Sequence, residues 1–231
     1  TIHKKIYTYE ADIKPHLRFM MDEKFRKKKS KEEIMKFIHE YLYIDEIAAE
    51  ALYNYMREQF DYIGIPHEKK IIVENYRDEQ MKNYVIFHSL YGRRVNDALS
   101  RALGYLMGQK VGRDIEIGIN DNGFYFAGEN LPVDEALKVL TVDNLQEALE
   151  EAISKTEVLK RRFRHCAGRS LMILRMYKGR RKRVGRQQVS SMILMSAVKR
   201  ISPNFSILKE AKREVLEDLM DIKNAKKVVY P

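Results

Sequence analysis

Residues 161–188 read RRFRHCAGRSLMILRMYKGRRKRVGRQQ and form the centre of a strongly basic stretch that covers residues 158–209. These 52 positions contain fifteen Lys or Arg and no Asp or Glu. The whole chain has 43 basic and 33 acidic residues and a net charge of +10, so the remainder, with 28 basic residues, is net −5. A positive field concentrated in one segment indicates a polyanion as the binding partner.

The first half of the basic stretch has the periodicity of an amphipathic helix. At about 100° per residue, its less polar side chains share one face. This face consists of Phe163, Cys166, Ala167, Ser170, Ile173, Leu174 and Tyr177. Arg161, Arg164 and Arg175 fall on the opposite face, while Arg162 and Arg169 flank the apolar stripe. The pattern predicts a helix over residues 158–177.

The second half of the stretch begins with Lys-Gly-Arg-Arg-Lys-Arg at residues 178–183. This run is too charged to bury and contains a glycine, so it predicts a loop, and residues 187–200 predict a further helix. We expect the outward helix face and the loop to contact nucleic-acid phosphates. The expected contacts are Arg161, Arg164, Arg175, Lys178, Arg180, Arg181, Lys182, Arg183 and Arg186.

The alternative is a solvated helix face followed by a solvated loop. Solvated helices normally mix charges of both signs, because opposite charges four residues apart stabilise each other. The lack of any acidic residue over the 52 positions favours the nucleic-acid interpretation.

The amino-acid composition is typical of a globular protein. Of its 231 residues, 45% are hydrophobic and 33% are charged, enough for a packed core. No apolar run reaches the ~18 residues that a membrane span needs, so we expect no membrane contact. Cys166 is the single cysteine, which excludes an internal disulfide and is typical of a reducing cytoplasm, the expected location.

Residues 1–66 predict a helical segment. Ser30 and Glu33 form a capping box at the start of one helix. A break at residues 43–45 separates it from a second helix over residues 46–62, and Gly64 stops that helix. The pair is consistent with a helix-turn-helix, although two helices joined in this way are more often a plain helical hairpin.

Residues 67–128 change to strand periodicity. Strands are predicted near residues 70–76, 83–88, 115–119 and 124–127, with a helix over residues 93–107 between the pairs. Asp121-Asn122-Gly123 is a strong hairpin signal. We expect an antiparallel ββαββ sheet with the helix packed on one face.

Residues 129–231 predict a helical region that carries the basic stretch. Its further helices are expected at residues 133–139, 144–155 and 207–220, and residues 223–227 are expected to be a frayed end. The fold class is therefore α+β, with helical N- and C-terminal parts around the middle sheet.

Few other motifs indicate chemistry. Gly92-Arg93-Arg94 lies between a strand and a helix, where free N–H groups and two guanidinium groups would seat a phosphate; alternatively both arginines are solvated. The chain has no Gly-Lys dipeptide and so no phosphate-binding loop of the G-x-x-x-x-G-K-[ST] type. Six dispersed histidines and no Cys-x-x-Cys predict no metal site. We expect no catalytic residue and no cofactor in this chain.

Two blocks together resemble a known family. The first is FHSLYGRRVNDALSR at residues 87–101, and the second is RFRHCAGRSLMIL at residues 162–174, followed by YKGR at 177–180 and VGRQQ at 184–188. They are similar to the region after the motor core in archaeal Lhr-type superfamily 2 helicases, over roughly residues 45–221. The resemblance implies an ATP-driven translocase that moves 3′ to 5′ on single-stranded DNA, whose motor domains use ATP and magnesium. This chain would be its accessory part, with the ATPase core absent.

We therefore interpret the chain as an accessory domain that guides single-stranded DNA for motor domains of the same polypeptide. The main alternative is a motor-free RNA-binding module associated with ribosomes or tRNA. A third class is an interaction module whose basic face docks on an acidic protein. The lack of Trp means that any stacking on bases must use Tyr, Phe or Arg.

Overall fold

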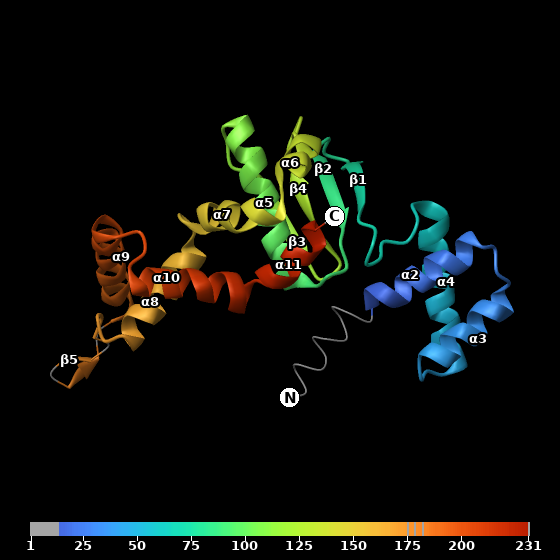
Figure 1. The fold of residues 1–231 in the computed structure, drawn as a ribbon, viewed down its shortest axis with the longest axis horizontal. Helices are drawn as coiled ribbons and strands as arrows, with labels where there is room; N and C mark the ends of the chain where they lie inside the picture. Colours follow the sequence, from blue (N-terminus) through green and yellow to red (C-terminus); the bar gives the residue numbers. More distant parts are fainter. Residues whose placement is uncertain (1–13, 175, 178, 182, 231) are drawn as a thin grey trace. The chain divides into compact units, whose positions relative to one another are not determined.

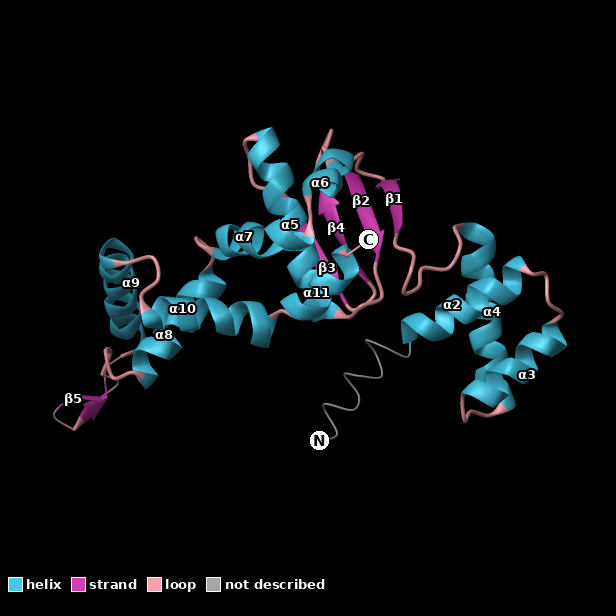
Figure 2. Cartoon of the chain, viewed as in Figure 1, coloured by secondary structure: helices cyan, strands magenta, loops and turns pink. Residues whose placement is uncertain are grey.

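The computed structural model describes residues 14–174, 176–177, 179–181 and 183–230 (Figure 1). Helices form both ends of the sequence and a four-stranded antiparallel sheet forms the middle (Figure 2). The predicted α+β class is confirmed.

The described chain divides into two compact units. One unit holds the chain up to Asn96 together with Gly118–Glu129, and the other holds Asp97–Ile117 together with the chain from Asn130 onward. Helix α5 (Arg93–Val111) and strand β3 (Glu116–Asn120) each begin in one unit and continue in the other. The division into domains at residues 1–66, 67–128 and 129–231 stays a prediction.

Three helices open the first unit: α2 (Lys14–Arg26), α3 (Lys31–Tyr41) and α4 (Glu46–Tyr62). The predicted capping box is confirmed, because the Glu33 N–H donates to Ser30 Oγ at 3.2 Å and the Ser30 N–H donates to the Glu33 carboxylate at 3.3 Å. The Asp45 carboxylate caps α4, which explains the predicted break before it. The three helices share a small core of their own, made of Leu17, Met21, Phe25, Ile34, Ile38, Ala49, Met56 and Ile65.

The sheet has the strand order β1-β2-β4-β3, with β1 at Ile72–Arg77, β2 at Asn83–His88 and β4 at Gly123–Ala127. Both described pairings, β1 with β2 and β2 with β4, are antiparallel, as expected. One face carries the buried rings of Phe87, Phe124 and Phe126, of which the first two stack with centroids 4.7 Å apart.

The start of α5 is tied to the sheet region by Asn96. This buried side chain accepts a hydrogen bond from Ser89 Oγ at 2.8 Å and donates to the Ser89 and Asn120 carbonyls at 2.9 and 3.1 Å. The helix predicted over residues 93–107 is confirmed and runs to Val111. Packing of its later turns on the sheet stays a prediction.

The second unit is mainly helical. After α5, its elements are α6 (Val133–Val139), α7 (Val142–Ile153), α8 (Glu157–Arg169), β5 (Met176–Tyr177), β6 (Arg180–Arg181), α9 (Val184–Ile201), α10 (Ser206–Arg213), the π-helical turn η2 (Glu214–Leu219) and α11 (Ile222–Val229). Helix α8 packs against α9, α10 and η2, and α11 packs against α7 and η2.

Three expectations about this unit are wrong. The helix predicted over residues 158–177 ends at Arg169, because Leu171 adopts a left-handed conformation (φ +60°) that closes it. The loop predicted over residues 178–183 includes strand β6, paired with β5. The tail at residues 223–227 is not frayed, since it belongs to α11, whose first turn is capped by Asp221 and whose Ala225 is buried.

Candidate nucleic-acid interface

Helix α8 supports the candidate interface through a buried apolar face. Thr156 caps its first turn by accepting a hydrogen bond from the Leu159 N–H. Phe163, Cys166 and Ala167 are buried, so the predicted apolar face is confirmed for the helical part of the basic stretch. This apolar face fixes α8 in the unit, and the arginines on its other side are left outward.

Arg161 and Arg164 lie on the outward side of α8. Arg161 is exposed and Arg164 is half-buried. Both line a groove of about 300 Å³, together with Glu157 and Lys160 of α8, which pair with each other at 2.7 Å. The opposite wall of the groove belongs to α9 and includes Gln188 and Met192. Among the described residues, neither arginine forms an ion pair, so both guanidinium groups are available to an anion in the groove. The structure therefore brings two of the predicted contact residues into one concave site.

Arg183 and Arg186 lie at the start of α9, and both are exposed. The sequence of α9 contains no acidic residue. Only Ser191, Met195 and Val198 of this helix are buried. The first turn of α9 thus adds two more cations to the same helix pair that forms the groove.

The other five predicted phosphate contacts of the stretch are only partly described. Arg175, Lys178 and Lys182 lie outside the described residues. Arg180 and Arg181 are described as strand β6, paired with β5 around Gly179, which has φ +74°. Phosphate contact by these five side chains stays a prediction.

The other expected phosphate seat lies at the start of α5. Gly92 has φ +84°, a conformation that glycine adopts readily, and the helix begins at the next residue. Arg93 is exposed and Arg94 is half-buried. The expected turn is therefore present, in the unit that does not contain α8 and α9, and phosphate contact by the two arginines stays a prediction.

Glu214 is a residue that sequence reasoning missed. It lies in the turn η2, and only 4% of its surface is exposed. Its carboxylate accepts a hydrogen bond from Arg169 and lies 3.7 Å from the guanidinium group of Arg162. The hydrogen bond to Glu214 raises the pKa of Arg169. The two arginines that flank the apolar stripe of α8 are therefore anchored to a buried carboxylate.

Cys166 lies on the buried side of α8, close to this anchor. Arg169 donates a hydrogen bond to Cys166 Sγ at 3.3 Å. Burial, together with the charge of Glu214, raises the pKa of the Cys166 thiol. The thiol is thus kept neutral at ordinary pH and is poorly suited to act as a nucleophile.

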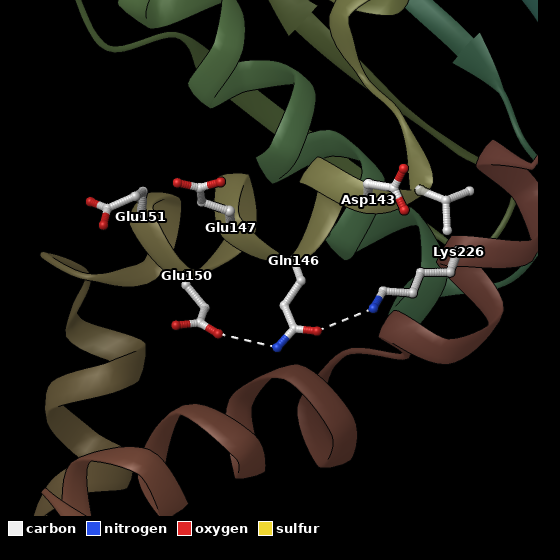
Figure 3. A pocket seen from close by; sticks show the side chains of 7 residues that line it. Asp143, Gln146, Glu147, Glu150, Glu151 and Lys226 are labelled. Carbon is white, nitrogen blue, oxygen red and sulfur yellow. Dashed lines mark hydrogen bonds between the residues drawn. The ribbon is translucent and has the colours of Figure 1, made fainter. Parts of the chain in front are cut away.

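Helix α7 presents the opposite charge. Its exposed side carries Asp143, Glu147 and Glu151 around a shallow hollow of about 430 Å³ (Figure 3). Gln146 bridges the hollow, because it donates to Glu150 at 3.2 Å and accepts from Lys226 at 3.1 Å. This surface would repel phosphate, in contrast to the groove that Arg161 and Arg164 line.

The described part of the chain has neither a cluster of metal ligands nor a helix that could span a membrane. Among those residues, His, Cys, Asp and Glu form no group of three or more that could hold a metal ion. Of the helices described, none has the length and apolar character needed to cross a membrane.

Comparison with known proteins identifies the family. A family model described as DEAD/H associated matches residues 65–230, which is most of the chain. The chain belongs to this family. The match of the DEAD/H-associated model includes the sheet and all of the helices that form the candidate interface.

The relatives of this DEAD/H-associated chain include archaeal helicases. The ATP-dependent helicase Lhr-Core of Methanothermobacter thermautotrophicus is 49% identical over 213 residues, which are 92% of this chain and 25% of the relative. The protein of the same name from Sulfolobus acidocaldarius is 41% identical, over 86% of this chain and 23% of the relative. The chain thus spans about a quarter of the length of these relatives.

A solved structure shares the fold of this DEAD/H-associated chain. The helicase Lhr of Mycobacterium smegmatis, solved bound to ssDNA and AMP-PNP, is 27% identical with a TM-score of 0.71. The alignment covers 84% of this chain and 26% of that one. Together with the archaeal relatives, it confirms the resemblance to Lhr-type helicases that the two sequence blocks predicted.

Proposed function

We propose that this chain is the accessory region of a longer ATP-dependent helicase and that the groove between α8 and α9 holds single-stranded DNA by its phosphates. The observation that carries the proposal is the meeting of Arg161 and Arg164 in one groove, on a pair of helices whose linker and second member contain no acidic residue. The single-stranded DNA in the solved relative supports the choice of ligand.

The proposed role is to hold and guide a strand while motor domains of the same polypeptide move it. Those motor domains would bind ATP and magnesium, translocate 3′ to 5′ and work in the cytoplasm. Since this chain has no phosphate-binding loop, we expect no ATP hydrolysis from it alone, with or without DNA. DNA-stimulated turnover by the purified chain would contradict this assignment of roles.

Phosphate contacts have a thermodynamic signature that tests the proposal. Each contact on a single strand contributes about −0.7 to the slope of log affinity against log salt. With roughly four to six contacts engaged, binding to a labelled oligothymidylate should weaken steeply between low and moderate salt. The measurement is a fluorescence-anisotropy titration at several salt concentrations.

The matched variants are Arg161→Ala/Arg164→Ala and Lys223→Ala/Lys227→Ala. Each pair removes two positive charges from exposed or half-buried positions of the same unit, but only the first pair lines the groove. The groove variant should flatten the salt slope by about 1.4 for every base sequence, and the α11 variant should bind as the unaltered chain does. Equal slopes for all three proteins would overturn the proposal.

The basic run at residues 178–183 is tested in the same way. Replacing Arg180, Arg181, Lys182 and Arg183 with Ala should weaken binding and flatten the slope further. If this variant binds with unchanged affinity, the run is only a solvated turn. Titration of RNA oligonucleotides of the same length separates DNA guidance from the RNA-binding alternative, which predicts a clear preference for RNA.

A further inference from the structure

The face of the sheet opposite the buried phenylalanines carries a row of three tyrosines. Tyr76 of β1 lies directly opposite Tyr84 of β2, and Tyr125 of β4 lies opposite Ile86, the next outward residue of β2. The ring centroids of Tyr76 and Tyr84 are 6.1 Å apart, and those of Tyr84 and Tyr125 are 5.5 Å apart. We call these three residues the tyrosine row.

The aromatic residues of the sheet are divided between its two faces. The phenylalanines on the other face are buried in the core, whereas Tyr76 is 48% exposed and Tyr125 is 36% exposed. Tyr84, between them, is half-buried. The open face of an antiparallel sheet is usually polar, so three adjoining rings on the face away from the phenylalanines are not explained by packing of the core. Contiguous exposed apolar surface of this kind marks a binding site.

The strand beside the row leaves room for its rings. A Cβ atom placed on Gly118 of β3 would lie 2.1 Å from the ring of Tyr125, so only glycine permits the ring to lie over that strand. The Tyr84 hydroxyl donates to Asp78 at 3.1 Å, and the Lys82 amino group lies 5.4 Å from the centroid of the Tyr84 ring. The central ring is therefore held in place, with a cation beside it.

We propose that the tyrosine row is a stacking platform for the bases of single-stranded nucleic acid. Bases of any sequence stack on aromatic side chains, and a row of rings that crosses three strands offers successive bases successive partners. The one acidic residue of β1, Glu74, shares this face and is engaged by His88 at 2.9 Å. Because the chain has no Trp, stacking on bases must use other side chains, and these tyrosines place three aromatic rings side by side on the sheet.

This inference rests on the proposed function for the identity of the ligand, and it adds a second kind of contact. The α8–α9 groove would take phosphates, and the tyrosine row would take bases. The two contacts have different signatures, because stacking releases no counterions and needs a base, whereas phosphate binding is salt-dependent and needs none.

The experiment compares two oligonucleotides of equal length, one of thymidine and one abasic, so that only the bases differ. The variants are Tyr76→Ala/Tyr125→Ala and the matched Tyr76→Phe/Tyr125→Phe, which keeps both rings. The unaltered chain should bind the thymidine strand about 10-fold or more tightly than the abasic strand, and the alanine variant should lose most of this preference. The phenylalanine variant should keep it.

The salt slope separates the two proposals. The alanine variant should keep the slope of the unaltered chain, and the Arg161→Ala/Arg164→Ala variant should keep the preference for bases. The proposal is overturned if the alanine variant keeps the full preference for the thymidine strand, or if the unaltered chain shows no such preference. In either case the tyrosine row does not bind bases. If the chain binds neither oligonucleotide, the proposed function fails as well.

Discussion

Helices α7 and α8 are consecutive, built in the same way and oppositely charged. They contain 12 and 13 residues, each begins at a threonine that caps the first turn, and each buries one apolar face. The outward residues of α7 include four carboxylates and no Lys or Arg, whereas α8 contains one acidic residue and five Lys or Arg. The same local design therefore tolerates either sign of charge.

This difference separates the charges that anchor the fold from those that are available to a ligand. Glu150 of α7 is paired with Lys212 at 2.8 Å, and Arg169 of α8 is paired with Glu214. Arg161 and Arg164, in contrast, line an open groove. Since α7 folds without cations on its outward side, a helix of this kind does not need Arg161 and Arg164 in order to fold, as expected if the two arginines serve the proposed DNA contact.

Giving the outward face of α8 the negative charge of α7 should cause the largest change in affinity for single-stranded DNA. Arg161→Glu/Arg164→Glu should reduce affinity for single-stranded DNA on the order of 100-fold at about 0.1 M salt, because two phosphate contacts are lost and two repulsive charges are added. Anisotropy titration measures the loss, and Lys223→Glu/Lys227→Glu is the control for charge alone. A comparable loss in the control would mean that net charge, and not the groove, governs binding.

Removing the buried carboxylate should test the anchoring charges. Glu214→Gln should lower the free energy of unfolding by about 2 kcal/mol, because Arg169 loses a charged hydrogen-bond acceptor and Arg162 loses a buried ion-pair partner. Glu150→Gln, at the half-buried pair with Lys212, should cost less than about 1 kcal/mol. Urea unfolding measures both, and the opposite ranking would contradict the assignment of Glu214 as the stronger anchor.

Local signals predicted most of the fold. The capping box at Ser30, the Asp121-Asn122-Gly123 turn and the periodicity of α8 each depend on residues close together in sequence, and each is found in the structure. The amphipathic pattern also placed Arg161 and Arg164 on the outward side of α8.

The errors occurred where the deciding interaction is not periodic or not local. The apolar pattern continues past Arg169 to Ile173, which is buried, although the helix ends at Arg169 and the left-handed Leu171 prevents it from continuing. Glu214 lies 45 positions from Arg169, so no sequence spacing indicates their pairing. The groove itself needs α9 opposite α8, a tertiary arrangement that the separate helix patterns do not contain.

Neutralising α7 should have a small effect of the opposite sign. Asp143→Asn/Glu147→Gln/Glu151→Gln removes three exposed negative charges and should raise affinity for single-stranded DNA about two- to three-fold at low salt through the weaker long-range repulsion. The gain should vanish at high salt, because screening shortens the range of the field. A gain that persists at about 1 M salt would show that α7 itself contacts the strand, and the contrast between an acidic α7 and a DNA-binding α8 would then fail.

The smallest change is expected at Cys166, which reports on the inner side of α8. Burial raises the pKa of this thiol above its ordinary value of 9.0, so the folded protein holds less thiolate than the unfolded chain at any pH near or above that value. A thiol-specific reagent at pH 8 should therefore react with the native protein far more slowly than with the protein in urea. The buried neutral thiol contributes to the free energy of unfolding in full below pH 9, and this contribution is lost as the pH rises through the higher pKa of the folded state.

The reaction rate of Cys166 also serves as a control for the charge-reversal variant. Arg161→Glu/Arg164→Glu should leave the rate in the native protein unchanged, because both substitutions lie on the outward face while Cys166 lies on the buried one. A rate in that variant close to the urea value would mean that charge reversal had opened the core, and its loss of DNA affinity would then count as unfolding rather than as evidence for the groove.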